Sequence, residues 1–327
     1  MVPPVSFPRL WFAAGLILSL GACALPRNIH WGYHGAALAP VLQIASGDTV
    51  HLTSWAAADA SALPPDRSLV QPGHLEALRM CEPGPATHML TGPVHVEGAE
   101  PGDVLQIDLL DIALNDRWGY TAIRPLRGTL PEEFDRRAII HPEIDIQRRT
   151  ARLPWGTEIA LAPFFGILAV APPPHWGRVA SIQPRKFGGN MDNKELQAGT
   201  TLYLPVFTPG ALFSAGDGHA VQGDGEVCIT ALETGLTGTF RLTVRKDLGY
   251  TCPFAESPTH LISIGLHEDL DEAARIAVRE MIDHVCRRTD LDREQAYMLC
   301  SLAGDVRVTQ LVDGEKGCHM MLAKALL

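Results

Sequence analysis

The 327-residue chain has no cluster of Lys and Arg residues that could neutralise a run of phosphates. Its 27 Lys plus Arg against 37 Asp plus Glu give a formal net charge of -10, so nucleic acid is not an expected partner. The chain also lacks a C-x-x-C pair, which argues against a structural zinc site of the usual spacing. No G-x-S-x-G elbow occurs, which argues against a serine hydrolase of that class.

The N-terminus carries the apolar run Leu10 to Leu20, which follows Arg9. This run is too short to span a bilayer comfortably and fits the h-region of a signal peptide. It ends in the letters LGAC, similar to a bacterial lipoprotein processing site, so residues 1–22 are predicted to be removed and Cys23 to carry lipid. A periplasmic or membrane-anchored location is expected. The alternative is a cytoplasmic protein with a downstream start codon, and mass spectrometry of the mature N-terminus distinguishes the two.

Six further cysteines leave the redox compartment open, because an even number is compatible with disulfides and does not require them. They are Cys81, Cys228, Cys252, Cys286, Cys300 and Cys318. Cys286 and Cys300 fall near the facing ends of two predicted helices, so a disulfide between them is a hypothesis. Cys228 is interpreted as a small buried hydrophobe.

Strand patterns dominate the first three quarters of the chain, and residues 29–327 are expected to form one large domain. Val104 to Ile112 and Thr239 to Arg245 alternate apolar and polar residues, which predicts two strands, and the second should have one wet face. Leu161 to Val170 is continuously apolar and predicts a strand buried on both sides. Gly and Pro punctuation about every ten residues favours packed antiparallel sheets.

Helices are predicted only late in the sequence. Glu268 to Arg287 places its apolar residues at helical spacing, and Asp292 followed by Gln295 predicts a capping box for a second helix through about Leu302. The predicted fold class is therefore β-rich α+β: packed antiparallel sheets, sandwich-like or barrel-like, with a C-terminal helical hairpin covering a sheet.

The stretch from Gly188 to Glu226 concentrates polar side chains around one apolar, Pro-bounded run. Its Asn, Asp, His and Glu residues lie among flexible glycines, which is what a metal-assisted hydrolytic site needs. Thr200 to Phe207 is predicted to be a strand entering a cluster of tight turns, and Glu226 to Glu233 a strand leaving it. The simpler alternative is that each Asp-Gly pair is an ordinary hairpin turn.

His219 is the first candidate metal ligand because glycines flank it inside what reads as a polar turn. Asp192 is the second, with helix N-capping as its alternative role. His88 is the third, with a surface-loop histidine as the alternative, and these three would leave an open position for water. His319 is the reserve ligand.

Two carboxylates are candidates for proton transfer. Glu226 ends the glycine-rich turn next to His219, and Glu97 alternates with His95 on a predicted strand. A salt bridge is the structural alternative for both glutamates. Asn190, or a backbone amide of Gly189 or its neighbour, could polarise a substrate carbonyl.

Substrate-binding roles are predicted for Gly189, Asp217 and Phe187. Gly189 and Asp217 belong to the glycine-rich motifs, whereas Phe187 is an aromatic candidate for the pocket wall.

Several long segments resemble the acetamidase/formamidase family. They are GGNMD at residues 188–192, LYLPVFTPGALFSAGDGHAVQGDGEV at 202–227, TGPVHVEGAEPGDVLQIDLLDI at 91–112, HWGYHGAALAPVLQIASGDTV at 30–50 and AYMLCSLAGDVRVTQLVDGEKGCHMMLAKAL at 296–326. The resemblance implies hydrolysis of a short carboxamide such as formamide or acetamide, with a divalent metal, expected to be zinc.

Other classes of function stay open at this point. A non-catalytic metal-binding or solute-binding protein of the cell envelope would use the same loops without releasing ammonia, and an ammonia assay separates the two. The expected partner is a small amide. Closed symmetric assembly into a homo-oligomer is the default expectation for such an enzyme.

Overall fold

A computed structural model describes residues 20–22, 26–56 and 59–327. Most of the predicted signal peptide, and Cys23 with its predicted lipid, lie outside these residues. Leu20–Ala22 is described and forms β1, a short strand that pairs parallel with β5 (Thr49–Thr53). Cleavage before Cys23 would therefore remove this strand.

The larger sheet has nine strands in the order β1-β5-β18-β7-β16-β19-β20-β22-β21. Beyond β1 and β5, its strands are β18 (Leu236–Arg245), β7 (Val104–Leu114), β16 (Thr201–Pro205), β19 (Phe254–Glu256), β20 (His260–His267), β22 (Lys316–Ala323) and β21 (Asp305–Gln310). The predicted strands at residues 104–112 and 239–245 are confirmed as parts of β7 and β18, which pair antiparallel along their length.

The smaller sheet has the order β15-β13-β17-β6-β2, with β4 pairing parallel to β6 at one side. Its strands are β15 (Gly188–Asn190), β13 (Phe164–Ala169), β17 (Phe213–His219), β6 (Met89–Val96), β2 (Ile29–Trp31) and β4 (Leu42–Ile44). Every residue of β13 is buried, as the continuous apolar run predicts.

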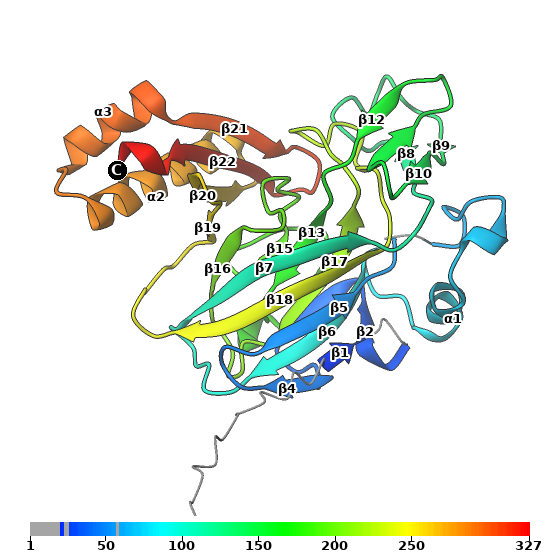
Figure 1. Cartoon of the computed structure of the whole chain (residues 1–327), viewed down its shortest axis with the longest axis horizontal. Coiled ribbons are helices and arrows are strands. Elements are labelled where there is room, and N and C mark those ends of the chain that lie inside the picture. Colours follow the sequence, from blue (N-terminus) through cyan, green and yellow to red (C-terminus); the bar gives the residue numbers. More distant parts are fainter. Residues whose placement is uncertain (1–19, 23–25, 57–58) are drawn as a thin grey trace, which may run out of the picture.

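The main hydrophobic core lies between these two sheets. In Figure 1, β7 and β18 cross in front of β13 and β17. Phe240 of β18 makes edge contacts with Phe165 of β13 and Phe213 of β17, at ring-centroid distances of 5.4 and 5.5 Å. Aromatic rings prefer this edge-to-face geometry, and the contacts bind one sheet to the other.

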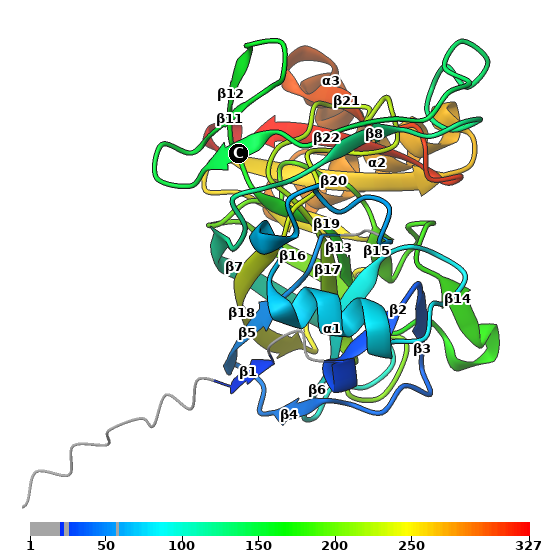
Figure 2. The same cartoon turned by 90° about the vertical axis from the view of Figure 1, so that its right-hand side faces the viewer.

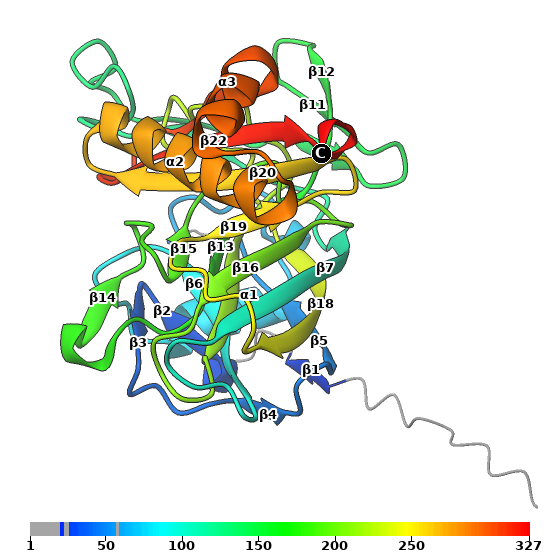
Figure 3. The same cartoon turned by 90° about the vertical axis from the view of Figure 1, so that its left-hand side faces the viewer.

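Two helices, α2 (Leu270–Arg288) and α3 (Arg293–Ala303), cover the far end of the larger sheet. Figure 3 shows α2 lying across β20 and β22. The close approach requires a glycine in β20, because a Cβ on Gly265 would lie 2.7 Å from the backbone nitrogen of Ala277. Asp292 and Gln295 form the predicted capping box at the start of α3. The β-rich fold and the helical hairpin are thus confirmed.

Smaller elements surround this frame. They are α1 (Pro72–Met80), the hairpin-like sheet β10 (Glu143–Asp145), β11 (Thr150–Arg152) and β12 (Glu158–Ala160), the pairs β8 (Thr121–Ile123) with β9 (Ala138–Ile140) and β3 (Tyr33–Gly35) with β14 (Arg178–Ala180), and the 3-10 turns Pro26–Asn28, Arg67–Leu69, Pro174–Trp176 and Lys324–Leu326. Figure 2 shows α1 beside the sandwich, far from α2 and α3. In the described part of the chain, no helix is both long and apolar enough to cross a bilayer.

Four local predictions were wrong. Helices were predicted only late in the sequence, yet α1 spans Pro72–Met80. Residues 226–233 form an irregular segment instead of a strand. Asp217 and His219 lie in strand β17 instead of a tight turn, because β17 pairs with β13 through Gly216 and Gly218. The six described cysteines are all free thiols, so Cys286 and Cys300 are not bridged.

Candidate active site

One end of the smaller sheet positions a group of buried polar side chains. Asp217 and His219 belong to β17, and Asp192 follows β15 on the other side of β13. Gly166 of β13 lies between them. A Cβ on Gly166 would lie 2.7 Å from Asp217 Oδ2 and 2.8 Å from His219 Cε1, and closer still to Asp192 Oδ1. A glycine at this position therefore leaves open the space in which the three side chains meet.

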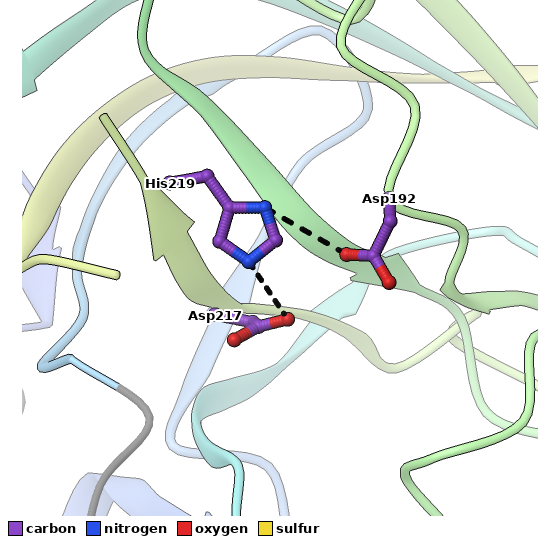
Figure 4. A group of neighbouring side chains, drawn as sticks. All are labelled: Asp192, Asp217 and His219. Atoms are coloured by element: carbon purple, nitrogen blue, oxygen red, sulfur yellow. Dashed lines mark ion pairs between the residues drawn. The ribbon is translucent and has the colours of Figure 1, made fainter. Parts of the chain in front are cut away.

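His219 is the centre of this group, and Figure 4 shows its ring between Asp192 and Asp217. Its Nε2 lies 3.3 Å from Asp217 Oδ2 and 3.4 Å from Glu233 Oε2. Its Nδ1 lies 3.8 Å from Asp192 Oδ1. Phe164 contacts the imidazole edge-on, with ring centroids 5.0 Å apart. An apolar wall and three carboxylates thus fix the orientation of the ring.

Two further acidic residues extend the group. Each of three triads can place one ligand atom per residue within 4.8 Å of the others: Asp192, Asp217 and His219; His219, Glu226 and Glu233; and Asp192, Glu226 and Asp313. Because the triads share members, they form one continuous group. We call Asp192, Asp217, His219, Glu226, Glu233 and Asp313 the pocket cluster.

The backbone of the pocket cluster is unusual. Asp192, Asp217 and Glu226 have φ values of +48, +57 and +44°, although L-residues rarely adopt positive φ. Such conformations cost free energy and gather at functional sites. Hydrogen bonds help to hold them, since the Asp192 amide donates to the Gly166 carbonyl at 3.2 Å and Gln222 Nε2 donates to the Asp192 carbonyl at 2.8 Å.

Burial and neighbouring charges set the protonation of His219 and its partners. Burial lowers the pKa of His219, but the carboxylates of Glu233 and Asp217 outweigh it and hold the pKa well above its usual value. Burial raises the pKa of Asp217, yet His219 and His88 outweigh it and leave the pKa below its usual value. The two residues therefore behave as a buried ion pair in the absence of a bound cation.

The other carboxyl groups are shifted in the opposite direction. Burial, followed by the Asp192 carboxylate, raises the pKa of both Glu226 and Asp313 well above the usual range. Burial also raises the pKa of Glu233 to about 7, against the opposing effect of His219. Like charges crowded in a dry site resist ionisation together, so these carboxyl groups hold their protons more strongly than exposed ones do.

An open cavity of about 400 Å³ leads to the pocket cluster. Its wall contains Asp217, Glu226, Glu233 and Asp313, together with Asn190, His88, Tyr120, Arg124, Arg127 and apolar residues that include Trp31 and Ile182. Solvent and a small molecule can therefore reach these buried carboxyl groups.

The donor atoms of the pocket cluster fit a metal ion. Among the described residues, several of its buried atoms have no hydrogen-bond partner: both carboxylate oxygens of Asp192, Glu233 Oε2, Asp313 Oδ2 and His219 Nδ1. Some of these atoms take part in the ion pairs with His219 described above, but none of them makes a hydrogen bond with another described residue, and buried polar atoms without hydrogen bonds are costly and call for a ligand. Carboxylate oxygens with an imidazole nitrogen are a donor set that Zn²⁺ and similar divalent cations accept.

The structure brings together most of the residues predicted from the sequence. Asp192, His219 and Glu226 meet in the pocket cluster, and Asp217 lies beside His219 instead of serving only as a substrate contact. Asn190 is buried and lines the cavity. His88 also lines the cavity, but it belongs to none of the described triads, and its Nδ1 pairs with Ser181 Oγ at 2.8 Å.

Other predicted residues lie elsewhere. Glu97 is exposed beyond the end of β6 and accepts a hydrogen bond from Gln43, so it has no place at the cavity. Phe187 is a core residue in edge contact with His34, and Gly189 is buried and does not line the cavity. His319 is not part of the pocket cluster.

Two members of the pocket cluster, Glu233 and Asp313, were not predicted from the sequence. Glu233 lies in the irregular segment that was predicted to be a strand, where one acidic residue is unremarkable. Asp313 precedes Gly314 in the connection between β21 and β22, so its sequence signal is that of an ordinary hairpin turn. Only the packing of that hairpin against the end of the smaller sheet shows its role.

Comparison with known proteins agrees with this architecture. An acetamidase from Bacillus halodurans has a similar structure, with a TM-score of 0.81 and 30% sequence identity over 94% of this chain and 98% of that chain. An acetamidase from Mycolicibacterium smegmatis is 29% identical over 202 residues, which cover 43% of this chain and 49% of the relative. A formamidase from Methylophilus methylotrophus is 28% identical over 191 residues, which cover 43% of this chain and 47% of the relative. The chain spans about half the length of the curated relatives it matches.

The model of the Acetamidase/Formamidase family matches most of the chain. It aligns with residues 28–176 and 176–323, which include the whole pocket cluster. Because these two segments cover far more than half of the chain, the protein belongs to the Acetamidase/Formamidase family.

Proposed function

We propose that this protein hydrolyses the C–N bond of a short linear carboxamide, of the formamide or acetamide type, to a carboxylate and ammonia, with a divalent cation such as zinc as cofactor. The observation that carries the proposal is the pocket cluster, in which an imidazole lies among several carboxylate oxygens that have no hydrogen-bond partner within the described part of the chain, and four of whose carboxyl groups line an open cavity. Family membership, and the activities named for the relatives, support the amide substrate.

Asp192, Asp217 and His219 are the residues that would hold the cation. A divalent cation supplies Lewis-acid polarisation of a carbonyl and acidifies water, which is the chemistry that an unreactive amide requires. Gly166 keeps the centre of the triad free, and Gln222 and the Gly166 carbonyl hold the Asp192 backbone.

Glu226 is the residue that would transfer protons. Its carboxyl group lines the cavity, and burial raises its pKa well above the usual value, which favours its protonated form as a proton donor. It would accept a proton from the attacking water and deliver one to the leaving amine. Glu233 has a different role. Its Oε1 accepts a hydrogen bond from the Ala231 amide at 3.0 Å, and its Oε2 faces His219 Nε2. Glu233 therefore orients the imidazole.

Asn190 is the group that would bind the carbonyl oxygen of the substrate. It is buried at the end of β15 and lines the cavity, where its side-chain amide can donate a hydrogen bond. The apolar part of the cavity wall would accommodate the acyl chain and exclude water around it.

The test is ammonia release from formamide, acetamide and propionamide by the purified full chain, measured before chelation, after chelation and after return of zinc. We expect chelation to abolish release and zinc to restore it. Glu226→Gln should retain the metal and lower kcat by about 10²–10⁴-fold, the usual contribution of a general acid or base. His219→Ala should lose the metal. His175→Gln, in the exposed 3-10 turn Pro174–Trp176 and outside both the cavity wall and the pocket cluster, is the matched control.

Each part of the proposal can fail separately. Undiminished turnover in the metal-free protein would overturn the metal requirement. Binding of an amide without any ammonia would instead indicate a non-catalytic binding protein. Loss of metal from Glu226→Gln would make Glu226 a ligand and leave proton transfer to another group.

A further inference from the structure

A second group of potential ligands lies outside the pocket cluster and shares no residue with it. Glu195, Asp224 and His319, here called the second cluster, can each place one ligand atom within 4.8 Å of the other two. Glu195 follows β15, Asp224 lies in the turn before Glu226, and His319 belongs to β22. Three segments that are distant in the sequence therefore converge on this point.

His319 indicates that the convergence has a ligand. The side chain is fully buried, its Nδ1 pairs with Thr309 Oγ1 at 2.7 Å, and its Nε2 has no hydrogen-bond partner among the described residues. When Nδ1 donates to Thr309, the lone pair of Nε2 is left free. A ring nitrogen held by a neighbour while the other nitrogen binds metal is the usual arrangement of a ligating histidine.

The two carboxylates of the second cluster already bind a cationic group, the ammonium of Lys194. Lys194 Nζ lies 3.1 Å from Glu195 Oε1 and 3.5 Å from Asp224 Oδ1, so an ammonium group already bridges the two carboxylates. Arg307 Nη1 lies 3.1 Å from the same Glu195 oxygen. The Lys194 side chain is partly exposed and flexible, and it can move aside. It satisfies the carboxylates but leaves His319 Nε2 unpaired.

We propose that Glu195, Asp224 and His319 form a second site, which binds a divalent cation of the zinc type in place of the Lys194 ammonium. One imidazole nitrogen with two carboxylate oxygens suits zinc and neighbouring transition metals, whereas Ca²⁺ and Mg²⁺ prefer oxygen ligands alone. Asp224 is the most exposed of the three side chains and provides the entry path.

The position of the second site assigns it a structural role. Glu195 comes three residues after Asp192, and Asp224 comes two residues before Glu226. The Gly225 amide donates to the Thr309 carbonyl at 3.0 Å, and the Leu311 amide donates to the Gly225 carbonyl at 3.1 Å. A cation here would tie the segments that carry two residues of the pocket cluster to strands β21 and β22.

The test measures the zinc content per chain of the full-length His219→Ala variant. This substitution removes the central ligand of the pocket cluster. After equilibrium dialysis against zinc, we expect about one equivalent per chain to remain, because binding depends on the ligands of each site separately. Adding His319→Gln should remove that equivalent, whereas adding His175→Gln should not. Zinc should raise the unfolding temperature of His219→Ala protein and of its His175→Gln derivative, but not of the His319→Gln derivative.

Two further variants keep the result decisive. Asp224→Asn in the otherwise unchanged protein should also lose one equivalent, which covers the case in which a His319 variant does not fold. Lys194→Met should bind zinc more tightly, because the competing ammonium is gone. Equal zinc content in His219→Ala protein with and without His319→Gln, or an unchanged count in Asp224→Asn, would overturn the second site. Since no turnover is measured, this outcome is independent of the amide hydrolysis proposed above.

Discussion

At the scale of single residues, the space between side chains matters as much as the side chains themselves. The pocket cluster exists because Gly166 has no Cβ and because Asp192, Asp217 and Glu226 adopt left-handed backbone conformations. Such conformations persist only where surrounding contacts determine them. Here Asp217 belongs to the paired strand β17, the Gly166 carbonyl accepts the Asp192 amide, and the Glu226 carbonyl accepts the Ile229 amide at 2.9 Å.

Gly166→Ala tests this view directly. The added methyl group would occupy the space shared by Asp192, Asp217 and His219, so we expect loss of bound metal and a fall in kcat/KM of about 100-fold or more, as for a displacement of about 1 Å at a catalytic centre. Elemental analysis and ammonia release are the measurements. Gly35→Ala in β3 is the control, since its Cβ would meet only ordinary contacts at 3.7 Å and beyond. Normal metal content in Gly166→Ala would show that the cluster does not depend on this gap.

At the scale of elements, the C-terminal hairpin shows how local signals and packing agree. The side chain of Asp292 accepts the Gln295 amide at 2.8 Å, and Gln295 Oε1 accepts the Asp292 amide at 3.0 Å. Both side chains are exposed, so the motif depends only on two residues that are three positions apart in the sequence. A sequence pattern of this kind needs no knowledge of the tertiary structure.

Asp292→Ala should therefore lower the free energy of unfolding by about 1 kcal/mol, the usual effect of losing an N-cap. Urea unfolding followed by circular dichroism measures it. Asp290→Ala is the matched control, because Asp290 is exposed nearby and caps no helix. An equal loss in both variants would mean that general charge, and not the cap, is responsible.

At the scale of the whole molecule, buried neutral histidines make stability depend on pH. Burial lowers the pKa of His30 and His74 to about 4 and that of His284 to about 3. These residues belong to β2, α1 and α2, so the effect is spread through the fold. In the unfolded chain these histidines have the ordinary pKa of 6.5, so below that pH the unfolded state binds protons that the folded state does not bind. Their contribution is complete above pH 6.5 and is lost as the pH falls toward 4.

The contribution of these histidines to the free energy of unfolding should consequently decrease as urea denaturation is repeated from pH 7 down to pH 4.5. His74→Phe should reduce the slope, because the ring is stacked between Trp55 and Trp118 and, among the described residues, neither ring nitrogen has a hydrogen-bond partner. Phenylalanine keeps the stacking and cannot be protonated. A slope identical to that of the unchanged protein would exclude His74 as a source of acid sensitivity.

The linear pattern was sufficient for the family, the β-rich class, the buried strand β13 and the capped helical hairpin. The family rests on the resemblance of long segments to its known members, whereas the other features depend on periodicity or on residues close together in the chain, and hydrophobic burial then follows from the pattern. The same holds for Asp192, His219 and Glu226, whose polar side chains stand out among glycines and apolar residues.

Only the tertiary structure decided which of the polar residues meet. Glu97 and Asp313 look alike as acidic residues near glycines, yet strand pairing leaves Glu97 in solvent and carries Asp313 into the pocket cluster. His219 and His319 were both candidate ligands of one site, and β17 and β22 place them in separate clusters. Strand register and sheet order bring together side chains a hundred residues apart, and those long-range contacts depend on the packing of the entire core.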